Sequence, residues 1–277
     1  MDAPLPFVTV SPDDTFSVNP AALSYLKQLS GRVAVVAIAG VYRSGKSYLL
    51  NQLAAAGGGA LLAVAGGVGG GSASATGTPL AGADAPPPRA PPPPGGAFAV
   101  GPTVKATTKG IWLWGRGVEV EGGSMTVLFL DTEGLGSTVR SETYDARIFA
   151  LALLLSSFFV YNSVGVIDGA AIAKLSYVAQ LTRVIKVRAG GGGGGSGAGA
   201  AAAAKEDPGT EFAQHFPSFM WVVRDFAVKL EGRDGRKMSA REYLEEALKP
   251  EDGVSEAVEA KNAVRMMLRN FFPERDW

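Results

Sequence analysis

The 277-residue sequence contains no cysteine. It can therefore form no disulfide and no thiolate metal site, and a chain of this kind suits a reducing compartment, so we expect a cytoplasmic location. Neither sign of charge is in excess, because 26 lysine and arginine residues balance 26 aspartate and glutamate residues. No overall field then draws the protein to nucleic acid or anionic lipid. We expect no nucleic-acid partner, and function has to come from a local site.

We also expect no secretory signal, because residues 1–6 contain no basic stretch followed by an apolar one. Residues 148–167 carry no charge over about the length that crosses a bilayer, so a membrane span is one interpretation. Polar residues and a glycine interrupt this segment, and the β-rich run at 158–161 follows a helix-like stretch of alanine and leucine. We therefore interpret it as a buried helix followed by a buried strand, and expect no membrane span in this chain.

Two segments have the composition of surface insertions. Residues from about 54 to 96 are rich in glycine, alanine, serine and proline, and residues from about 190 to 209 are poly-glycine followed by poly-alanine. Such segments contain too few large apolar side chains to offset the entropy lost on ordering. The remaining sequence amounts to one domain. Residues 1–277 are therefore predicted to form a single domain with two low-complexity insertions.

The rest of the sequence alternates between strand and helix patterns. Continuous apolar runs predict buried strands at 32–39, 124–130, 158–161 and 219–223. Amphipathic spacing predicts helices at 241–248 and 254–269, and Asp168 can cap another helix. The apolar face of that helix would comprise Ile172, Leu175, Val178, Leu181 and Ile185. This alternation predicts the α/β fold class, with a mostly parallel central sheet flanked by helices.

Residues 40–47 match the phosphate-loop pattern Gly-x-x-x-x-Gly-Lys-Ser/Thr. They lie between a predicted strand and an apolar helix start, so that backbone N–H groups and the helix N-terminus can converge on phosphate. Lys46 would reach the β- and γ-phosphates, and the Ser47 hydroxyl would ligate Mg²⁺. A chance match in a glycine-rich chain is the alternative, which the flanking strand and helix patterns disfavour. The other predicted nucleotide-binding residues here are Gly40, Tyr42, Arg43, Ser44, Gly45 and Tyr48.

A second motif, Asp131-Thr132-Glu133-Gly134, follows the strand predicted at 124–130. Downstream of a phosphate loop, Asp131 is where a carboxylate on the magnesium side is needed, and Gly134 could offer its N–H to the γ-phosphate. Taken alone the motif is weak, because a glycine-rich chain contains such tetrads in ordinary turns. Its position after a buried strand favours the functional interpretation.

Thr107 and Thr108 lie between these two motifs and precede Lys109-Gly110-Ile111-Trp112. A threonine in this part of the chain can ligate magnesium when a γ-phosphate is present, which would make the segment a nucleotide-sensing switch. On composition alone, they are two loop threonines before an edge strand.

Base recognition is open at this stage, because a phosphate loop serves ATP and GTP alike. The sequence has no Asn-Lys-x-Asp motif, and the nearest string, residues 204–207, lies inside poly-alanine instead of after a strand. Arg224-Asp225 is a better candidate because it ends an apolar run and so falls at the carboxyl edge of the sheet. Asp225 could accept the two N–H donors of guanine. A surface ion pair between the two residues is the alternative.

Together these residues resemble the large GTPase domain of the guanylate-binding proteins, a branch of the dynamin-like superfamily. The resemblance covers nearly the whole chain outside the two insertions. It depends on the phosphate loop with arginine at Arg43, on Thr108-Lys109-Gly110-Ile111-Trp112 and on Asp131-Thr132-Glu133-Gly134-Leu135-Gly136. Further matching strings occur at residues 19–23, 159–163, 224–226 and 269–273.

The resemblance implies that the chain binds and hydrolyses GTP, giving GDP and, in some members, GMP. It implies that Asp225 and Arg224 meet guanine, that Arg43 is an arginine finger supplied in cis, and that Glu133 helps to arrange the catalytic water. Thr108, Ser47 and Asp131 would be the Mg²⁺ residues, with Thr108 as the switch threonine. Homodimerisation through the nucleotide face is also implied, with Arg265 and Arg269 near the place where two domains meet.

One departure from the family keeps other functions open. Ala106 stands where the family often has a serine that positions attacking water, two residues before the switch threonine. A GTP-binding interaction module with weak or no hydrolysis is therefore the alternative to an active GTPase. An ATP-using phosphate-loop enzyme, such as a small-molecule kinase, is a third class.

Overall fold

The structure is a computed structural model, and it describes residues 3–55, 98, 108–114, 117–120, 125–136, 141–176, 216–232 and 234–277. Three sets of predictions lie outside these residues. They are the second insertion, the first insertion beyond Ala55, and the roles of Ala106, Thr107, Val178, Leu181 and Ile185.

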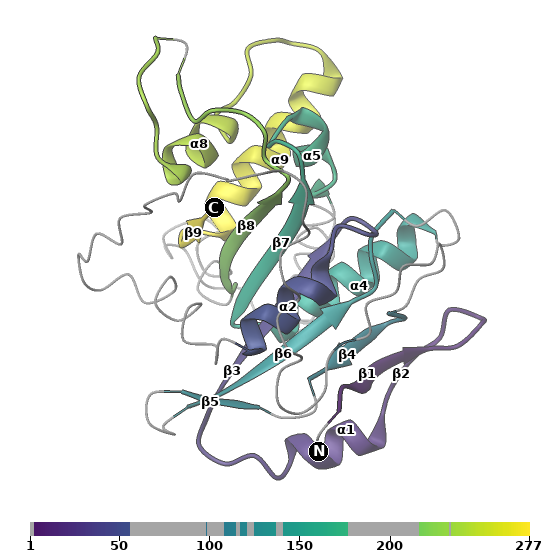
Figure 1. The fold of residues 1–277 in the computed structure, drawn as a ribbon. Coiled ribbons are helices and arrows are strands. Elements are labelled where there is room, and N and C mark those ends of the chain that lie inside the picture. Colours follow the sequence, from purple (N-terminus) through teal and green to yellow (C-terminus); the bar gives the residue numbers. More distant parts are fainter. Residues whose placement is uncertain are drawn as a thin grey trace, which may run out of the picture.

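A nine-stranded sheet runs through this part of the chain in the order β2-β1-β4-β6-β3-β7-β8-β9, with β5 paired to β6 (Figure 1). The neighbouring strands β6, β3, β7, β8 and β9 are parallel, whereas β2, β1, β4 and β5 pair in antiparallel fashion at the other side. The predicted mostly parallel sheet is confirmed. The strand bounds are β1 (Leu5–Val10), β2 (Phe16–Val18), β3 (Arg32–Gly40), β4 (Ile111–Leu113), β5 (Val118–Val120), β6 (Met125–Thr132), β7 (Phe158–Val164), β8 (Ser218–Arg224) and β9 (Arg275–Asp276).

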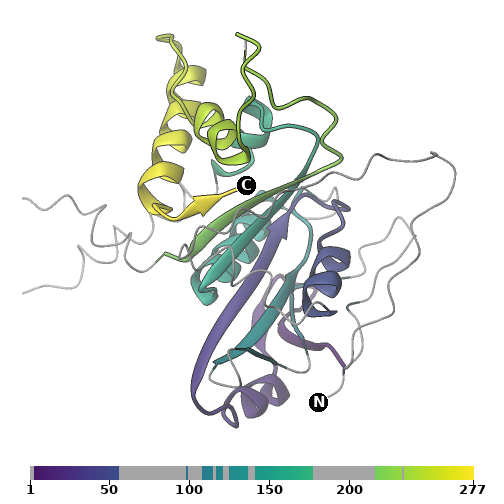
Figure 2. The same cartoon turned by 60° about the vertical axis from the view of Figure 1, so that its left-hand side comes forward.

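Helices cover both faces of the sheet (Figures 1 and 2). Their bounds are α1 (Pro20–Leu26), α2 (Lys46–Ala55), α4 (Glu142–Leu155), α5 (Gly169–Ala173), α8 (Ala240–Ala247) and α9 (Glu256–Phe271). Polar side chains accept a backbone N–H at the start of five of these helices, which satisfies groups that the helix itself cannot bond. The five capping residues are Asn19, Ser141, Asp168, Ser239 and Ser255.

The predicted helix after Asp168 is confirmed at its start. Asp168 accepts from the Ala171 N–H at 2.7 Å, and Ile172 and Leu175 are buried. The helices predicted at 241–248 and 254–269 are present as α8 and α9, with bounds shifted by one or two residues.

The uncharged segment at residues 148–167 is a helix followed by a strand, as predicted. Helix α4 ends at Leu155, and β7 begins at Phe158 between β3 and β8. Within the described part of the chain, none of the helices has the length and apolar character needed to cross a membrane.

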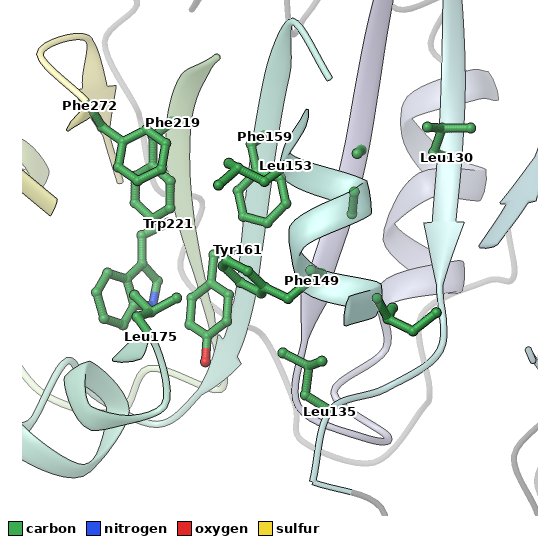
Figure 3. Close-up of a cluster of buried hydrophobic side chains, with 14 of the residues drawn as sticks. Leu130, Leu135, Phe149, Leu153, Phe159, Tyr161, Leu175, Phe219, Trp221 and Phe272 are labelled. Atoms are coloured by element: carbon green, nitrogen blue, oxygen red, sulfur yellow. The ribbon is translucent and has the colours of Figure 1, made fainter. Parts of the chain in front are cut away.

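Two apolar layers sandwich the sheet because its buried strands alternate their side chains between faces. In β3, Ala37 and Ala39 join one layer, and Val36 and Ile38 join the other. The first layer contains residues of α4, α5, α8 and α9, and its aromatic part lies around Phe159, Tyr161 and Trp221 (Figure 3). The second contains Leu50 and Ala54 of α2. The central strands are therefore buried on both sides, which explains their continuous apolar sequences.

The first residues of the segment predicted as an insertion from about residue 54 belong to helix α2. Ala54 is 7% exposed and packs in the second apolar layer, and α2 continues to Ala55. Further on, Phe98 is buried against Trp114, with ring centroids 5.0 Å apart. The side chain of Asn51 bonds both backbone groups of Phe98, accepting from its N–H at 2.9 Å and donating to its carbonyl at 3.1 Å. Composition underestimated the helix because alanine is both a low-complexity residue and the best helix former.

Candidate nucleotide-binding site

The phosphate loop connects the end of β3 to the start of α2, at the carboxyl edge of the parallel strands. The loop is bonded to the segment that follows β6. Leu135 donates its N–H to the Gly40 carbonyl at 3.0 Å, and Tyr42 donates to the Leu135 carbonyl at 2.8 Å. The two predicted phosphate-side motifs therefore form one continuous structure at the edge where folds of this type bind ligands.

Two glycines let the elements of this site approach closely. Gly45 has φ +81°, and a Cβ there would lie 2.7 Å from Nη1 of Arg224. A Cβ on Gly134 would lie 2.4 Å from the Tyr42 Cα and 3.0 Å from the Lys46 Nζ. A larger residue at position 134 would push the segment after β6 away from the loop, so Gly134 is needed for steric reasons. Gly45 is needed for its positive φ, since the flexible end of Arg224 could move aside.

Ser47, Thr108 and Asp131 converge as predicted from the sequence. Asp131 Oδ2 accepts from the Ser47 hydroxyl at 2.6 Å and from the Thr108 hydroxyl at 3.0 Å, and the two hydroxyl oxygens are 3.5 Å apart. Asp131 is fully buried, and its Oδ1 has no hydrogen-bond partner among the described residues. This set consists only of hard oxygen donors with one carboxylate, which is what Mg²⁺ takes when phosphate and water supply its other ligands. The residues therefore fit the predicted Mg²⁺.

Burial opposes both charges at the base of the loop. It lowers the pKa of Lys46, an effect that the negative charges of Asp131, Glu133 and Asp145 partly reverse. Burial likewise raises the pKa of Asp131, against the nearby Lys46 charge and the hydrogen bonds from Ser47 and Thr108. The Lys46 ammonium meanwhile donates to the Val41 carbonyl at 3.2 Å. Each charge depends on the other for compensation, and an anionic phosphate with a divalent cation would compensate both.

Glu133 lies in a buried network behind the loop. Its Oε2 accepts from the Gly110 N–H at 3.1 Å and from the Tyr144 hydroxyl, and its own N–H donates to the Gly110 carbonyl at 2.9 Å. The carboxylate is thus bonded to the segment that carries Thr108 and to the first turn of α4. Its role with a catalytic water remains a prediction.

Arg43 is exposed at the turn of the loop with φ +62°, in the left-handed region. Its guanidinium carbon lies 5.8 Å from the centroid of the Tyr42 ring. An exposed arginine here can turn toward a bound phosphate without breaking a buried contact.

Arg224 and Asp225 lie at the end of β8, beside the phosphate loop. The Arg224 guanidinium packs over the Tyr48 ring, 5.7 Å from its centroid, and its Nη1 is 3.5 Å from the Gly45 carbonyl. Asp225 is exposed with φ +54°. Within the described residues these two side chains form no ion pair with each other. The structure therefore does not contain the surface ion pair that was the alternative for Arg224 and Asp225, and the Asp225 carboxylate is available to a ligand.

Sequence analysis missed two residues that support the site. Asn162 is buried at the end of β7 and donates from Nδ2 to the Ser44 carbonyl at 2.8 Å and to the Ser44 hydroxyl at 2.7 Å. An asparagine inside an apolar strand at the level of the loop was the available signal, because a buried amide needs partners. Tyr144 is the second, and its position in a helix N-terminal turn gave no such signal.

Arg265 is buried within the domain, whereas Arg269 is exposed. The Arg265 side chain is 3% exposed, and its guanidinium donates to Glu251 at 2.5 Å, Asn262 at 3.2 Å and the Ala247 carbonyl at 3.3 Å. A guanidinium used in this way links α9 to the end of α8. The place of these two arginines near a dimer interface remains a prediction.

A cavity of about 1380 Å³ lies elsewhere, between α5, α8, α9 and the turn around Gly235. None of its lining residues belongs to the phosphate loop, to the segment after β6 or to Arg224-Asp225. It is open and lined by charges of both signs. The loop geometry, and not the size of this cavity, identifies the candidate site.

The parallel sheet, the loop between β3 and α2, and the hydroxyl and carboxylate cluster beside it define the class: this is a P-loop α/β protein. The sequence model described as "Guanylate-binding protein, N-terminal domain" matches residues 13–276. The chain belongs to the guanylate-binding protein family.

Individual relatives agree with this assignment. The chain is 36% identical over 259 residues to guanylate-binding protein 1 of Chlorocebus aethiops, which covers 93% of this chain and 35% of the relative. It is 36% identical over 266 residues to human guanylate-binding protein 2, covering 94% and 36%. It is 35% identical over 276 residues to mouse guanylate-binding protein 7, covering 99% and 35%. The chain thus spans about a third of the length of these relatives.

Proposed function

We propose that this chain is a Mg²⁺-dependent GTP-binding and GTP-hydrolysing domain. The observation that carries the proposal is the meeting of Ser47, Thr108 and Asp131 beside the phosphate loop, with a buried Asp131 oxygen that has no partner among the described residues. Such a cluster suits a nucleotide with a γ-phosphate, because contacts with that phosphate and its Mg²⁺ hold switch segments of this kind in place. Membership of the guanylate-binding protein family supports the choice of guanine.

In the proposed reaction a water molecule attacks the γ-phosphorus, the bond from phosphorus to the β–γ bridging oxygen breaks, and GDP and phosphate leave. Bound Mg²⁺ would supply charge neutralisation at the phosphate oxygens, held by Ser47, Thr108 and Asp131. Lys46 would neutralise β- and γ-oxygens, and Arg43 would act on the charge that develops in the transition state. Glu133 would help to orient the water.

For the base, we propose that Asp225 accepts the ring N1–H and the exocyclic amine of guanine. Its exposure and its lack of an ion pair with Arg224 support this role, as does the position of Arg224 over Tyr48 beside the loop. Gly45 and Gly134 would offer their backbone N–H groups to the phosphates, and Gly40 and Ser44 would line the loop around them.

Three finer parts of the proposal concern the whole protein. Two copies would meet through the nucleotide face, with the exposed Arg43 and Arg269 as the candidates for contact. GDP would be the main product, and GMP would be a second product. A cysteine-free sequence suits a cytoplasmic site of action. Analytical ultracentrifugation with GDP and aluminium fluoride, and chromatography of the products, test the first two.

Steady-state turnover with GTP and with ATP, at saturating Mg²⁺, tests the proposal directly. We expect phosphate release from GTP that needs Mg²⁺, and none from ATP. Tight GTP binding without turnover would indicate a GTP-binding interaction module. Ala106 is the residue that would explain such a result, because it stands where the family often has a serine that positions the attacking water. Preference for ATP together with a need for an acceptor would indicate a kinase.

The Asp225→Asn substitution tests guanine recognition. Asparagine offers one acceptor and one donor, so one guanine donor loses its partner, at a cost of about 1–3 kcal/mol. The same amide suits xanthine, which has a carbonyl where guanine has its amine. We expect weaker GTP binding and stronger XTP binding by calorimetry. Asp252→Asn, at another exposed carboxylate, is the control and should change neither affinity; an unchanged GTP preference in Asp225→Asn would remove this residue from the site.

A further inference from the structure

Tyr144 connects the first turn of α4 to the segment that follows β6. It is 2% exposed, and its hydroxyl donates to Glu133 Oε2, the oxygen that also accepts the Gly110 N–H. Since Gly110 in turn accepts the Glu133 N–H, three hydrogen bonds join these three residues. Nothing in the sequence motifs assigns a role to this tyrosine.

The position of Tyr144 is fixed by its surroundings. The Ser141 side chain accepts the Tyr144 N–H at 3.2 Å and so holds the start of α4, while the Tyr144 ring packs against Phe16 with centroids 5.7 Å apart. The neighbouring Asp145 accepts the Gly136 N–H at 2.6 Å. The first turn of α4 therefore holds the segment after β6 at both Glu133 and Gly136.

This network adjoins the phosphate site on two sides. Gly110 follows Thr108 by two residues, and Thr108 bonds Asp131. Gly134 follows Glu133 and lies against Tyr42 and the Lys46 ammonium. A shift of the Glu133 carboxylate would therefore change the placement of Thr108 and of Gly134, the residues expected to respond to a γ-phosphate.

We propose that Tyr144 is a positioning residue for nucleotide hydrolysis, which acts through Glu133 to hold the Thr108 segment against the segment that follows β6. The proposal rests on the proposed GTPase function and adds a residue to it. A buried carboxylate with two donors on one oxygen has little freedom to rotate, so the hydroxyl keeps both Glu133 and Gly110 in place. Side chains that orient a metal ligand commonly change activity by about 10–100-fold, and we expect an effect of the same order for Tyr144.

The test compares Tyr144→Phe with Tyr25→Phe. Tyr25 also bonds a backbone N–H through its hydroxyl, accepting from Gly117 at 2.9 Å, but that contact lies away from the phosphate loop. For Tyr144→Phe we expect kcat for GTP to fall at least about 10-fold. We expect the Kd for GDP to stay within about twofold, because GDP has no γ-phosphate to be positioned, while KM for GTP rises about fivefold because the Thr108 segment no longer holds the γ-phosphate. Tyr25→Phe should leave all three constants unchanged.

Two results would overturn the proposal. One is a kcat within about twofold of the parent chain, and the other is a parallel loss of kcat and GDP affinity with a lower melting temperature, which indicates a structural role only. If the parent chain itself does not hydrolyse GTP, the proposed function fails. The role of Tyr144 is then tested by the ratio of the affinity for a non-hydrolysable GTP analogue to the affinity for GDP. That ratio falls at least about fivefold in Tyr144→Phe if the hydroxyl positions the switch threonine, and stays constant if it does not.

Discussion

At the scale of single residues, the candidate site contains two charged side chains, Lys46 and Asp131, that the folded chain does not need for its own stability. Lys46 and Asp131 are buried, and burial shifts the pKa of each toward its neutral form. Their mutual attraction offsets part of that cost, as do the hydroxyl bonds from Ser47 and Thr108 to Asp131. Residues that are retained in spite of such a cost commonly belong to functional sites.

Lys46→Ala should abolish nucleotide binding without unfolding the domain. At neutral pH the lysine is protonated in the unfolded chain, and because burial lowers its pKa in the folded chain, that proton costs free energy on folding. Removing the charge returns this cost, which offsets both the lost bond to Val41 and the attraction that Asp131 loses. We expect GTP affinity to fall by at least about 100-fold in calorimetry, since a charge-assisted phosphate contact is lost. The melting temperature without nucleotide should change by less than about 3 °C. Lys27→Ala is the control and should keep its GTP affinity. The prediction fails if Lys46→Ala retains GTP affinity, or if Lys27→Ala loses as much affinity as Lys46→Ala.

At the scale of elements, helix α2 has two tasks. Its first turn carries Lys46 and Ser47, and one turn further along, Asn51 fixes the chain where it returns at Phe98. Without this anchor, roughly fifty residues would separate the end of α2 from Thr108. With Phe98 fixed, only roughly ten residues lie between the anchor and Thr108, so a shorter loop has to be closed to place Thr108. The anchor therefore lies between the first insertion and the Thr108 segment.

Asn51→Ala tests this anchor. The change leaves the N–H and the carbonyl of a buried Phe98 without partners, which should lower the free energy of unfolding by about 3 kcal/mol in urea denaturation. Asn262 is the control, because its side chain bonds both backbone groups of Glu251 in the same way but in an exposed setting, at 2.8 Å each, and it also accepts from Arg265 at 3.2 Å. Water can replace the bonds to Glu251, and Arg265 keeps its bonds to Glu251 and to the Ala247 carbonyl, so Asn262→Ala should cost less than about 1 kcal/mol. Equal effects would mean that the buried anchor adds little.

A second element contact, between α8 and β9, makes stability depend on pH. Arg275 donates from Nη2 to Glu245 Oε2 at 2.8 Å and from Nη1 to the Phe272 carbonyl at 2.8 Å. The Arg275 Nε also lies 2.7 Å from Glu245 Oε1, in an ion pair that lacks the alignment of a hydrogen bond. The hydrogen bond from Arg275 lowers the pKa of Glu245 below its usual value of 4.5. A lowered carboxyl pKa contributes stability above the unfolded pKa, and that contribution disappears as the pH falls through the folded pKa.

Glu245→Gln should therefore destabilise the protein at pH 7 and much less at pH 3. The Glu245 side chain is 35% exposed, so solvent screening limits the effect at pH 7 to about 1 kcal/mol. Urea denaturation of the parent and the variant at both pH values measures it. Glu246→Gln breaks a pair with Lys249 in which both side chains are more than half exposed, and it should have almost no effect. A difference that persists at low pH would show that packing, and not charge, is responsible.

At the scale of the whole molecule, the sheet order decides where the site lies. The phosphate loop follows β3, Asp131 lies at the end of β6 on one side of it, and Asn162 and Arg224 lie on the other side in β7 and β8. The antiparallel strands β2, β1 and β4 and the N-terminus occupy the edge opposite β9 and the C-terminus (Figure 1). Four parallel strands thus end at one edge and supply most of the site.

Replacing residues 57–95 by a linker of about six glycine and serine residues should leave stability and GTP affinity almost unchanged, because Asn51 already holds the two ends of this segment together. Shortening the loop lowers its closure entropy, which stabilises the fold by at most about 2 kcal/mol. A loss of several degrees in melting temperature would mean that part of the segment packs on the domain. A deletion that begins at Leu53 is the control, since it also removes the buried Ala54 and should destabilise the protein.

The sequence by itself determined the local features of this protein: the strands, the capped helices, the phosphate loop and the convergence of Ser47 with Asp131. These follow from apolar periodicity and from the rule that parallel strands end at one edge of a sheet. Only the tertiary structure decided the bonds of Tyr144 to Glu133, Asn51 to Phe98 and Asn162 to Ser44, which join residues 11, 47 and 118 positions apart. It also decided that Arg265 is buried. Such contacts depend on the rotation of each helix and on the register of each strand. The sequence shows that a side chain is polar, but it does not show which buried partner that rotation and register will place beside it.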